Sequence, residues 1–436
     1  MKYYSTRKST SDVDLKTAVT KGLADDNGLF MPERIEQFDD AFFKNISNLS
    51  FQEIAFEVAN KFFGDDVEKS SLKKLVYDAI NFDCPVVPVQ GNIYSLELFH
   101  GPTLAFKDVG ARFMSRLLAY FLEKSEKTVH VLVATSGDTG SAVANGFLGV
   151  EGIHVHVLYP KGKVSDIQES QFTTLGQNIT AIEIDGTFDD CQRLVKAAFL
   201  DNEVKNQLTL TSANSINVAR FLPQAFYYFN AYARLQLKLN ELGKELVISV
   251  PSGNFGNLTA GLFAKRMGLP IAKFIAANNN NDIVYNYLKS GKYEPRASVQ
   301  TIANAMDVGD PSNFVRVLDL YNNNHAAISA DIVGYRYSDD EIRRVMKQVY
   351  NECGYLLDPH GACAYEALVE YLSPGQLGVF FETAHPAKFT ETVEAVVGKG
   401  NVPLPAKLAE FMKGEKQSIS QSKEFADFKA YLLQLK

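Results

Sequence analysis

Long apolar segments are absent from this chain of 436 residues. No run approaches the roughly 18 consecutive apolar residues that a membrane-spanning helix needs. The first residues, Met1-Lys2-Tyr3-Tyr4-Ser5, lack the apolar core of a secretory signal peptide. We therefore expect a cytoplasmic protein that does not enter a membrane.

Cysteine and histidine patterns that bind metals are also absent. None of the four cysteines shows CxxC spacing, which is typical of unpaired thiols in a reducing cytosol. The seven histidines include no HExxH motif. His154 and His156 would share one face of a strand, but a catalytic zinc site needs about three protein ligands. We predict that both histidines are structural and that the chain binds no metal.

The excess of charge is small. The 44 Lys and Arg residues stand against 51 Asp and Glu residues, which gives a formal net charge of −7. A protein of this charge is not expected to bind nucleic acid or an anionic membrane, so any anion site must be built locally. Hydrophobic residues at 46% and charged residues at 22% are ordinary values for a folded globular protein.

What the chain does contain, from about residue 85 onward, is an alternation of apolar β-branched runs with helical patterns. Predicted strands are Val129–Ala134, Ile153–Leu158, Ile179–Ile184, Leu208–Thr211, Leu246–Val250, Phe274–Ala277 and Leu377–Phe381. Predicted helices are 109–123, 140–149, 166–175, 188–200, 217–240, 257–267 and 282–289. This alternation predicts a doubly wound, mainly parallel α/β sheet, whose sites lie in the loops after the carboxyl ends of strands.

Two of the predicted strand-to-helix loops share one pattern. Ser136-Gly137-Asp138-Thr139-Gly140 and Ser252-Gly253-Asn254-Phe255-Gly256 both fit Ser-Gly-[Asp/Asn]-x-Gly, and both open a helix. Glycine lets the backbone approach a ligand closely, and a helix N-terminus offers unpaired N–H groups. Each loop is therefore a candidate anion cradle.

Lys107 follows a Gly-Pro turn and the apolar run Leu104-Ala105-Phe106. The helical pattern that comes next places this lysine at or near a helix N-terminus. Apolar neighbours and the positive end of a helix both disfavour the ammonium form, and a free amine is what Schiff-base chemistry requires. The alternative is a surface lysine paired with Asp108.

Together, the lysine and the two loops predict a ligand set with at least two anionic groups. Pyridoxal phosphate and a phosphorylated or carboxylated amino acid meet that description. A dinucleotide fold would need GxGxxG and a P-loop would need GxxxxGK[ST], and neither occurs. The remaining alternative is a module that senses nucleotides or amino acids with the same loops and does not need Lys107.

Five segments in order resemble the threonine synthase family, in its longer bacterial and fungal branch, which has an extra N-terminal region like residues 1–80. The segments are His100–Asp108, Ala134–Gly140, Ser212–Asn217, Ser252–Gly256 and Thr383–Phe389. The resemblance implies two doubly wound, mainly parallel αβα domains of the tryptophan synthase β type. We expect a mostly helical region at 1–80 and a catalytic region at 81–436, with a smaller α/β subdomain at about 109–210 inserted in the larger one.

The resemblance also implies a lyase that uses pyridoxal phosphate to convert O-phospho-L-homoserine and water to L-threonine and phosphate, with no obligate protein partner. The alternative within the same fold is a threonine or serine deaminase. Lys107 would hold the cofactor covalently and act as the catalytic base, with Asp138 beside the pyridine 3-oxygen. Thr383 would face the pyridine nitrogen. The cradle for the cofactor phosphate would consist of Gly253, Asn254, Phe255, Gly256 and Asn257.

For the substrate, the same resemblance implies contacts from the first loop and from a later helix start. The residues are Thr135, Ser136, Thr139, Asn214, Asn217 and Arg220. Asn217 and Arg220 are three residues apart and would share a helix face, and the arginine fork suits phosphate oxygens. The alternative is an asparagine cap with an arginine paired to a surface carboxylate. We predict that the run Asn278–Asn281 is a polar helix entry and that His385 only orients other groups.

Overall fold

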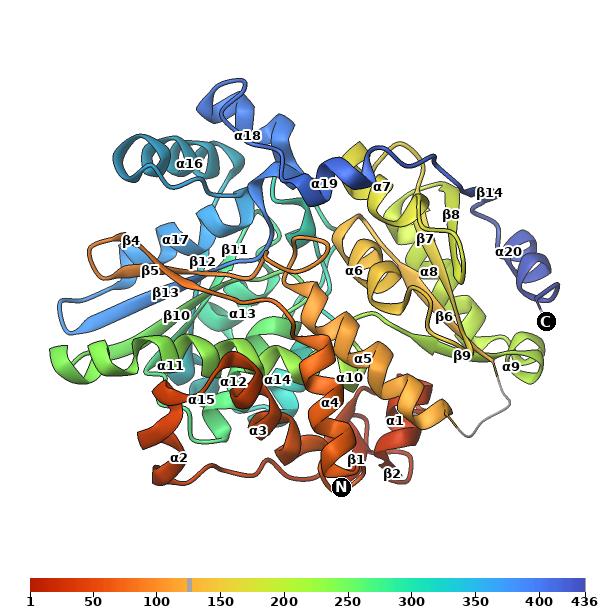
Figure 1. The fold of residues 1–436 in the computed structure, drawn as a ribbon, viewed down its shortest axis with the longest axis horizontal. Helices are drawn as coiled ribbons and strands as arrows, with labels where there is room; N and C mark the ends of the chain where they lie inside the picture. Colours follow the sequence, from red (N-terminus) through yellow and green to blue (C-terminus); the bar gives the residue numbers. More distant parts are fainter. Residues whose placement is uncertain (124–127, 436) are drawn as a thin grey trace. The chain divides into compact units, whose positions relative to one another are not determined.

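The structure, a computed structural model, describes residues 1–123 and 128–435. The chain forms two compact units. The first unit consists of Met1–Met31, Lys107–Arg220 and Leu404–Lys436, and the second consists of Pro32–Phe106 and Phe221–Pro403. Each unit is built around its own sheet (Figure 1).

The first unit contains a five-stranded sheet in the order β14-β8-β7-β6-β9, in which all neighbours are parallel. Its strands are β6 (Val129–Ala134), β7 (Ile153–Pro160), β8 (Ile179–Asp185), β9 (Thr209–Ser212) and β14 (Ile419–Ser422). Its helices are α1 (Leu15–Lys21), α5 (Lys107–Leu122), α6 (Asp138–Phe147), α7 (Asp166–Thr173), α8 (Phe188–Leu200), α9 (Asn202–Gln207), α10 (Val218–Phe221), α19 (Ala406–Phe411) and α20 (Phe425–Leu432).

Successive residues of these strands point to opposite faces of the sheet. Leu158 of β7 joins an apolar core with residues of α8 and α20, whereas its neighbour Val157 lies against Gly140 of α6. Both faces are therefore covered by helices, as doubly wound sheets require.

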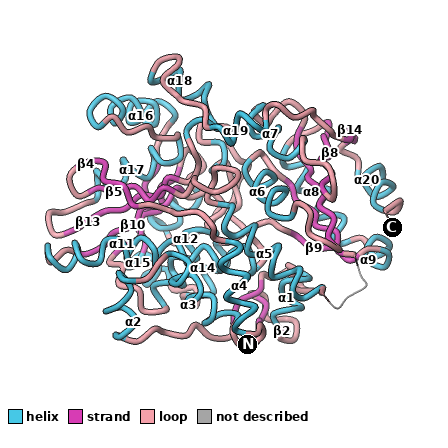
Figure 2. The backbone as a smooth tube through the Cα atoms, in the orientation of Figure 1, coloured by secondary structure: helices cyan, strands magenta, loops and turns pink. Residues whose placement is uncertain are grey.

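The second unit contains a six-stranded sheet in the order β12-β11-β10-β13-β5-β4, parallel except for the β4–β5 pair. Figure 2 shows four neighbouring strands of this sheet, β10, β13, β5 and β4. Its strands are β4 (Val86–Gln90), β5 (Ile93–Glu97), β10 (Glu245–Pro251), β11 (Lys273–Asn278), β12 (Ile332–Arg336) and β13 (Gln376–Glu382). Phe380 of β13 packs its ring against Tyr365, and the next residue, Phe381, packs against Tyr228. Helices thus cover both faces of this sheet as well.

The helices of the second unit lie before, between and after its strands. They are α2 (Asp40–Asn45), α3 (Phe51–Phe63), α4 (Lys69–Ala79), α11 (Ala225–Leu242), α12 (Gly256–Arg266), α13 (Ile283–Ser290), α14 (Phe314–Leu320), α15 (His325–Asp331), α16 (Asp339–Cys353), α17 (Pro359–Tyr371) and α18 (Thr390–Val397). A small sheet of β1 (Lys2–Ser5), β2 (Val13–Asp14) and β3 (Phe30–Pro32) completes the strands.

All seven predicted strands are present, and the α/β class with mainly parallel sheets is confirmed. The predicted single helix 217–240 is wrong, since α10 ends at Phe221 and α11 begins at Ala225 after a 3₁₀ turn that contains Pro223. Proline lacks the N–H that a continuous helix needs. The tail 413–423 is largely exposed as predicted, but it also supplies β14. The predicted boundary at residue 80 and the inserted subdomain stay predictions.

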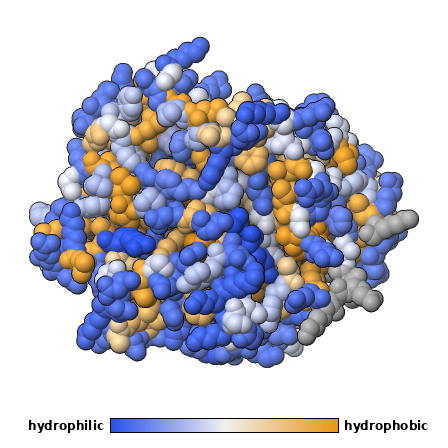
Figure 3. Space-filling view, in the orientation of Figure 1, coloured by the Kyte–Doolittle hydropathy of each residue, from blue (hydrophilic) through white to orange (hydrophobic). Residues whose placement is uncertain are grey.

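Within the described ranges, no helix combines the length and apolar character needed to cross a membrane. Large apolar side chains that are exposed are spread over several elements, for example Leu237 on α11 and Leu200 on α8. Hydrophilic residues surround the apolar ones on the face drawn in Figure 3. Scattered apolar residues of this kind are ordinary for a folded protein surface.

Candidate active site

Lys107 is the first residue of α5, as the Gly-Pro turn before it predicts. The stretch that leads to it is pinned within the second unit by a β-bridge between Ala105 and Ala384 and by a 2.8 Å hydrogen bond from Phe106 N to Thr383 O. Leu104 has a φ of +57°. This left-handed conformation is uncommon for residues other than glycine. The backbone just before Lys107 is therefore held at several points.

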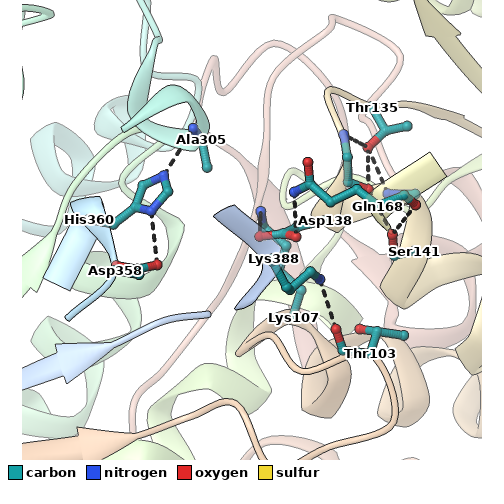
Figure 4. Close-up of polar contacts among 12 residues, drawn as sticks. Thr103, Lys107, Thr135, Asp138, Ser141, Gln168, Ala305, Asp358, His360 and Lys388 are labelled. Carbon is teal, nitrogen blue, oxygen red and sulfur yellow. Dashed lines mark hydrogen bonds and ion pairs between the residues drawn. The ribbon is translucent and has the colours of Figure 1, made fainter. Parts of the chain in front are cut away.

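Asp138 is the first residue of α6, and its side chain is buried. Its Oδ2 atom lies 4.0 Å from Lys107 Nζ, and its Oδ1 atom accepts a 2.8 Å hydrogen bond from Gln168 Nε2 (Figure 4). The Lys107 side chain is 17% exposed, so the pair is largely shielded from water. The first unit thus brings together an amine, a carboxylate and an amide that orients the carboxylate.

The first loop is closed on itself by Thr135. Its Oγ1 atom accepts hydrogen bonds from Gly137 N at 2.9 Å and Gly140 N at 2.8 Å (Figure 4). Those two N–H groups were expected to face an anion, and they bind a hydroxyl of the loop instead. Ser136 and Thr139 are the half-buried residues of this loop.

Gly137 has a φ of +143°, and a Cβ atom there would meet the Gln168 amide at 2.6 Å. Glycine is therefore required both by the backbone and by the close approach of Gln168. The sequence analysis did not select Gln168. Its one local signal is its place three residues after Ser165, which caps α7.

The helix start after β9 is organised by asparagine amides. Asn217 Nδ2 donates to Val19 O at 2.8 Å and to Ser212 O at 3.2 Å, and its Oδ1 accepts from Ala219 N. Asn214 Nδ2 donates to Ala134 O at 3.2 Å. Both amides therefore bind the backbone of their own unit.

Arg220 is 3% exposed and donates from Nη1 to Ala213 O at 2.7 Å. Its Nε atom lies 3.4 Å from where a Cβ atom of Gly110 would stand. Gly110 is three residues after Lys107, so the two share one face of α5. The guanidinium accordingly lies beside the face of α5 that begins with Lys107, rather than on the protein surface.

The second loop joins β10 to α12. Gly253 packs so tightly that a Cβ atom would stand 2.9 Å from Ala305 O and 2.9 Å from Met306 Cα. Phe255 adopts a left-handed conformation with a φ of +61° just before Gly256 opens the helix. Asn254 Oδ1 accepts a 2.6 Å hydrogen bond from Ser312 N, which fixes the loop from the other side.

Asn257, in the first turn of α12, has a donor left over for a ligand. Tyr228 Oη contacts both its O and its Oδ1 at 2.9 Å, while Nδ2 is buried and has no hydrogen-bond partner among the described residues. An unsatisfied buried donor costs free energy unless a ligand supplies an acceptor. The helix N-terminus adds a partial positive charge. Gly253, Phe255 and Asn257 thus fit a phosphate group.

Thr383 follows β13 directly and is 7% exposed. The residue before it, Glu382, is wholly buried, and burial together with Asp358 raises its pKa well above the ordinary value. The sequence analysis missed Glu382, although a carboxylate that closes an otherwise apolar strand was visible as a signal. It also missed the neighbours of Glu382, Asp358 and His360, which lie together only in the folded chain.

Three of the four residues in the run Asn278–Asn281 are buried, and none has been drawn to a helix cap. Asn279 and Asn281 donate to Asp307 Oδ1 at 2.8 and 3.1 Å, and so hold the loop that ends beside Gly253. Burial raises the pKa of Asp307 to about 6. The run lies directly before α13, as predicted for a polar helix entry, but these amides bind a loop further along the chain and not the helix start.

Three further histidines, His385, His130 and His156, have contacts inside the fold. Burial lowers the pKa of His385 to about 4, with His100 as a smaller cause, and its Nδ1 accepts from Ala387 N at 3.1 Å. In the first unit, His130 Nδ1 and His156 Nε2 are 3.1 Å apart on neighbouring strands. No group of three or more side chains suited to a metal occurs within residues 1–123 and 128–435.

Comparisons with known proteins show the family of the chain. The family model described as "Pyridoxal-phosphate dependent enzyme" matches residues 86–379, which defines the class. Two further models match the ends of the chain, "Threonine synthase N terminus" at 2–80 and "Threonine synthase, C-terminal" at 361–432. The chain belongs to the threonine synthase family.

Individual relatives extend over the whole chain. Threonine synthase of Escherichia coli (strain K12) is 46% identical over 410 residues, 94% of each chain. The crystal structure of threonine synthase from Escherichia coli has a TM-score of 0.92 at 43% identity and covers 99% of both chains. Threonine synthase from Brucella melitensis, solved with bound pyridoxal phosphate, has a TM-score of 0.91 at 36% identity and covers 99% of this chain and 98% of that one. Pyridoxal phosphate is thus the cofactor of the threonine synthase family.

Proposed function

We propose that this chain converts O-phospho-L-homoserine and water to L-threonine and phosphate, with pyridoxal phosphate as cofactor. The observation that carries the proposal is the shared face of α5. The amine of Lys107 begins this face, and the guanidinium of Arg220 lies beside Gly110, one turn further on. A covalent cofactor chemistry and a phosphate-bearing substrate need these two groups close together.

Lys107 would hold the cofactor through its amine, and it is proposed to move protons at the substrate. Bound pyridoxal phosphate supplies an electron-withdrawing ring that stabilises negative charge at the substrate α-carbon. Lys107 Nζ takes the α-proton and returns a proton at the end of the cycle. Asp138, 4.0 Å away, attracts the ammonium form and keeps the side chain oriented between transfers.

The second loop is proposed to hold the cofactor phosphate, through the backbone of Gly253, Asn254, Phe255 and Gly256 and the free donor of Asn257. Thr383 is proposed to face the ring nitrogen. A hydroxyl can bond to that nitrogen without imposing the charge that a carboxylate would bring.

Arg220 is proposed as the main contact of the substrate phosphate, because a guanidinium offers a fork of charged donors. Ser136, Thr139 and Asn214 are proposed as further substrate contacts. Thr135 and Asn217 are proposed to act indirectly on the substrate, since their side chains bind the backbone that shapes the two substrate loops.

The test is an assay of products with purified protein and O-phospho-L-homoserine. We expect phosphate and L-threonine in equal amounts, with no ammonia. Ammonia and a keto acid formed from L-threonine would instead support the deaminase. Binding of pyridoxal phosphate without either turnover would support the sensing module.

Two broader proposals go with this function. Residues 1–80 and 81–436 are proposed as the N-terminal and catalytic regions, and the family model at 2–80 supports that boundary. A cytoplasmic location is supported by the four cysteines, all of which are free thiols.

A further inference from the structure

A line of buried contacts in the second unit begins at the loop that contains Gly253. Gly253 lies against the backbone of Ala305 and Met306, where even a methyl group would not fit. Ala305 N in turn donates a 3.2 Å hydrogen bond to His360 Nε2 (Figure 4). The position of the loop therefore depends on a segment that His360 holds.

His360 is 2% exposed and sits in the first turn of α17. Because its Nε2 accepts from Ala305, the ring proton is on Nδ1, which lies 3.0 Å from Asp358 Oδ2 (Figure 4). Asp358 caps α17 by accepting from Gly361 N through Oδ1 at 2.6 Å. Both oxygens of Asp358 are thus used, and the ring of His360 is fixed at both nitrogens.

The line continues from Asp358 to the end of β13. Asp358 N donates a 2.6 Å hydrogen bond to Glu382 Oε1. Glu382 Oε2 lies against Gly361, where a Cβ atom would overlap it at 1.4 Å. Glu382 directly precedes Thr383, so buried groups connect the second loop to Thr383 over more than a hundred residues of sequence.

Three carboxyl groups meet at this point. Glu97, opposite Glu382 in the parallel β5–β13 register, has Tyr355 Oη and His100 Nε2 as partners at 2.9 and 2.8 Å. Asp358 binds His360 through Oδ2 and the start of α17 through Oδ1. Glu382 Oε2 is buried and has no hydrogen-bond partner among the described residues. Of the three carboxyl groups, Glu382 is therefore the one whose neutral form is most favoured by its surroundings.

Burial, Asp358 and Glu97 all raise the pKa of Glu382, which favours its neutral form. The titratable groups around this line come from β5 and the segment after it, the segment after the 3₁₀ turn Asn304–Met306, the segment before α17 and its first turn, and the loop after β13. They are Glu97, His100, Asp307, Tyr355, Asp358, His360 and His385.

We propose that His360 is a positioning residue for the cofactor phosphate, which holds the Gly253 loop through Ala305 and ties it through Asp358 and Glu382 to Thr383. The proposal rests on the proposed function, since it takes the Gly253 loop as the phosphate site. His360 touches neither phosphate nor ring. It acts by fixing the two elements that do, in the way that buried partners commonly orient the groups that contact a ligand.

Two substitutions separate the two ends of the ring. In His360→Asn the amide reaches the Nδ1 position, so it keeps Asp358 and loses Ala305. In His360→Gln the amide reaches the Nε2 position, so it keeps Ala305 and loses Asp358. The measurement is the dissociation constant of full-length cofactor-free protein for pyridoxal phosphate and for pyridoxal, which lacks the phosphate, together with Tm without ligand.

For His360→Asn we expect the dissociation constant for pyridoxal phosphate to rise about tenfold, the scale of one lost hydrogen bond, and that for pyridoxal to change less than about twofold. The dissociation constants of His360→Gln for both ligands should stay within about threefold of those of the original protein. If either variant fails to fold, the other still decides, since a Gln variant that loses phosphate-dependent affinity contradicts the role of Ala305.

Equal weakening of both ligands in His360→Asn, or no change in either, would overturn the positioning role. A separate result concerns the proposed function. If the original protein itself shows no preference for pyridoxal phosphate over pyridoxal, the phosphate loop is wrongly assigned and the inference falls with it. A strong preference that His360→Asn leaves intact removes only the inference.

Discussion

The two loops with the pattern Ser-Gly-[Asp/Asn]-x-Gly are built for different tasks. In the first unit, Thr135 takes the N–H groups of Gly137 and Gly140, and the loop presents the side chain of Asp138 toward Lys107. In the second unit, the loop is fixed from outside by its neighbours, and Asn257 keeps a buried donor for a ligand.

The difference shows that the shared glycine pattern predicts tight packing against the glycine, but not which group packs there. At Gly137 the close neighbour is the Gln168 side chain, and at Gly253 it is the backbone of Ala305 and Met306. In the first loop, the Gln168 side chain orients the carboxylate of Asp138. In the second loop, the neighbouring backbone does not use the side-chain donor of Asn257, which is available to a ligand. This difference is the reason we propose proton chemistry for the first loop and anion binding for the second.

The largest expected effect separates these tasks directly. Lys107→Ala should lower kcat by at least about a hundredfold, and up to about ten-thousandfold, because the base is gone. Pyridoxal phosphate should still bind without its covalent absorbance band, held by the second loop. Absorbance spectra and equilibrium dialysis measure both properties, with Lys163→Ala at an exposed lysine as the control. Complete loss of cofactor binding would contradict the division of tasks.

Replacing Gly253 or Gly137 with alanine compares the contribution of each loop to cofactor binding and to stability. Gly253→Ala should weaken pyridoxal phosphate binding by about tenfold to a hundredfold, since the new methyl group meets backbone that cannot easily move. Gly137→Ala should instead lower the free energy of unfolding by about 1–3 kcal/mol, because a φ of +143° strains any other residue.

Titration with cofactor and chemical denaturation of both glycine variants supply the comparison. Equal effects on cofactor affinity from the two substitutions would show that the loops share one task.

Arg220→Ala extends the comparison to the substrate. With the first loop closed by Thr135, the substrate phosphate needs another partner in the first unit. Loss of a charged hydrogen bond of roughly 1.5–3 kcal/mol corresponds to a fall of about one to two powers of ten in kcat/KM. The cofactor spectrum should not change. Arg220→Lys, which keeps the charge without the fork, should recover part of the loss, and unchanged kcat/KM in Arg220→Ala would assign the residue to structure alone.

Gln168→Ala sharpens the view of the first loop. Asp138 would lose the amide that orients its Oδ1 atom, and we expect kcat to fall by up to about tenfold with little change in cofactor affinity. Gln168→Glu should be worse, because a second carboxylate would face Asp138. Steady-state kinetics with cofactor titration measures the two quantities, and a normal kcat in both variants would remove Gln168 from the site.

The smallest effects concern stability against pH, and two groups, His130 in the first unit and Glu382 in the second, should act in opposite directions. Burial lowers the pKa of His130 to about 4 from an ordinary 6.5. The folded first unit thus binds fewer protons than the unfolded chain between these values, so stability is present above pH 6.5 and is lost as the pH falls toward 4. Between pH 7 and 5 the loss should be at most about 2 kcal/mol for this histidine.

Glu382 acts in the opposite sense, since its pKa is raised in the folded state. Its stabilisation is present below the ordinary value of 4.5 and is lost as the pH rises through the folded pKa. Glu382→Gln should remove this loss, and His130→Asn should reduce the loss at low pH, part of which remains because burial also lowers the pKa of His156 to about 3. Denaturation midpoints of the three proteins across pH 5 to about 8 provide the measurement, and parallel curves would show that neither group titrates as described.

The sequence by itself determined the local features of the molecule. Val129–Ala134 is a strand, 188–200 is a helix and Lys107 opens a helix, because periodicity and Gly-Pro signals act over a few neighbouring residues. The family motifs likewise led to the cofactor and reaction class. Strands β4, β5 and β12 were missed, since short strands carry little periodicity and depend on their partners in the sheet.

The tertiary structure alone decided which polar groups meet. Asn217 binds Val19 O from 198 residues away, Gln168 reaches Asp138 across 30 residues, and Glu382 meets Asp358 N. Nothing near each residue in the sequence specifies these partners, because a buried polar group bonds to whatever the packing of sheets and helices brings within about 3 Å. The chain encodes the chemistry locally, and the fold assigns each side chain to a ligand, to another side chain or to the backbone.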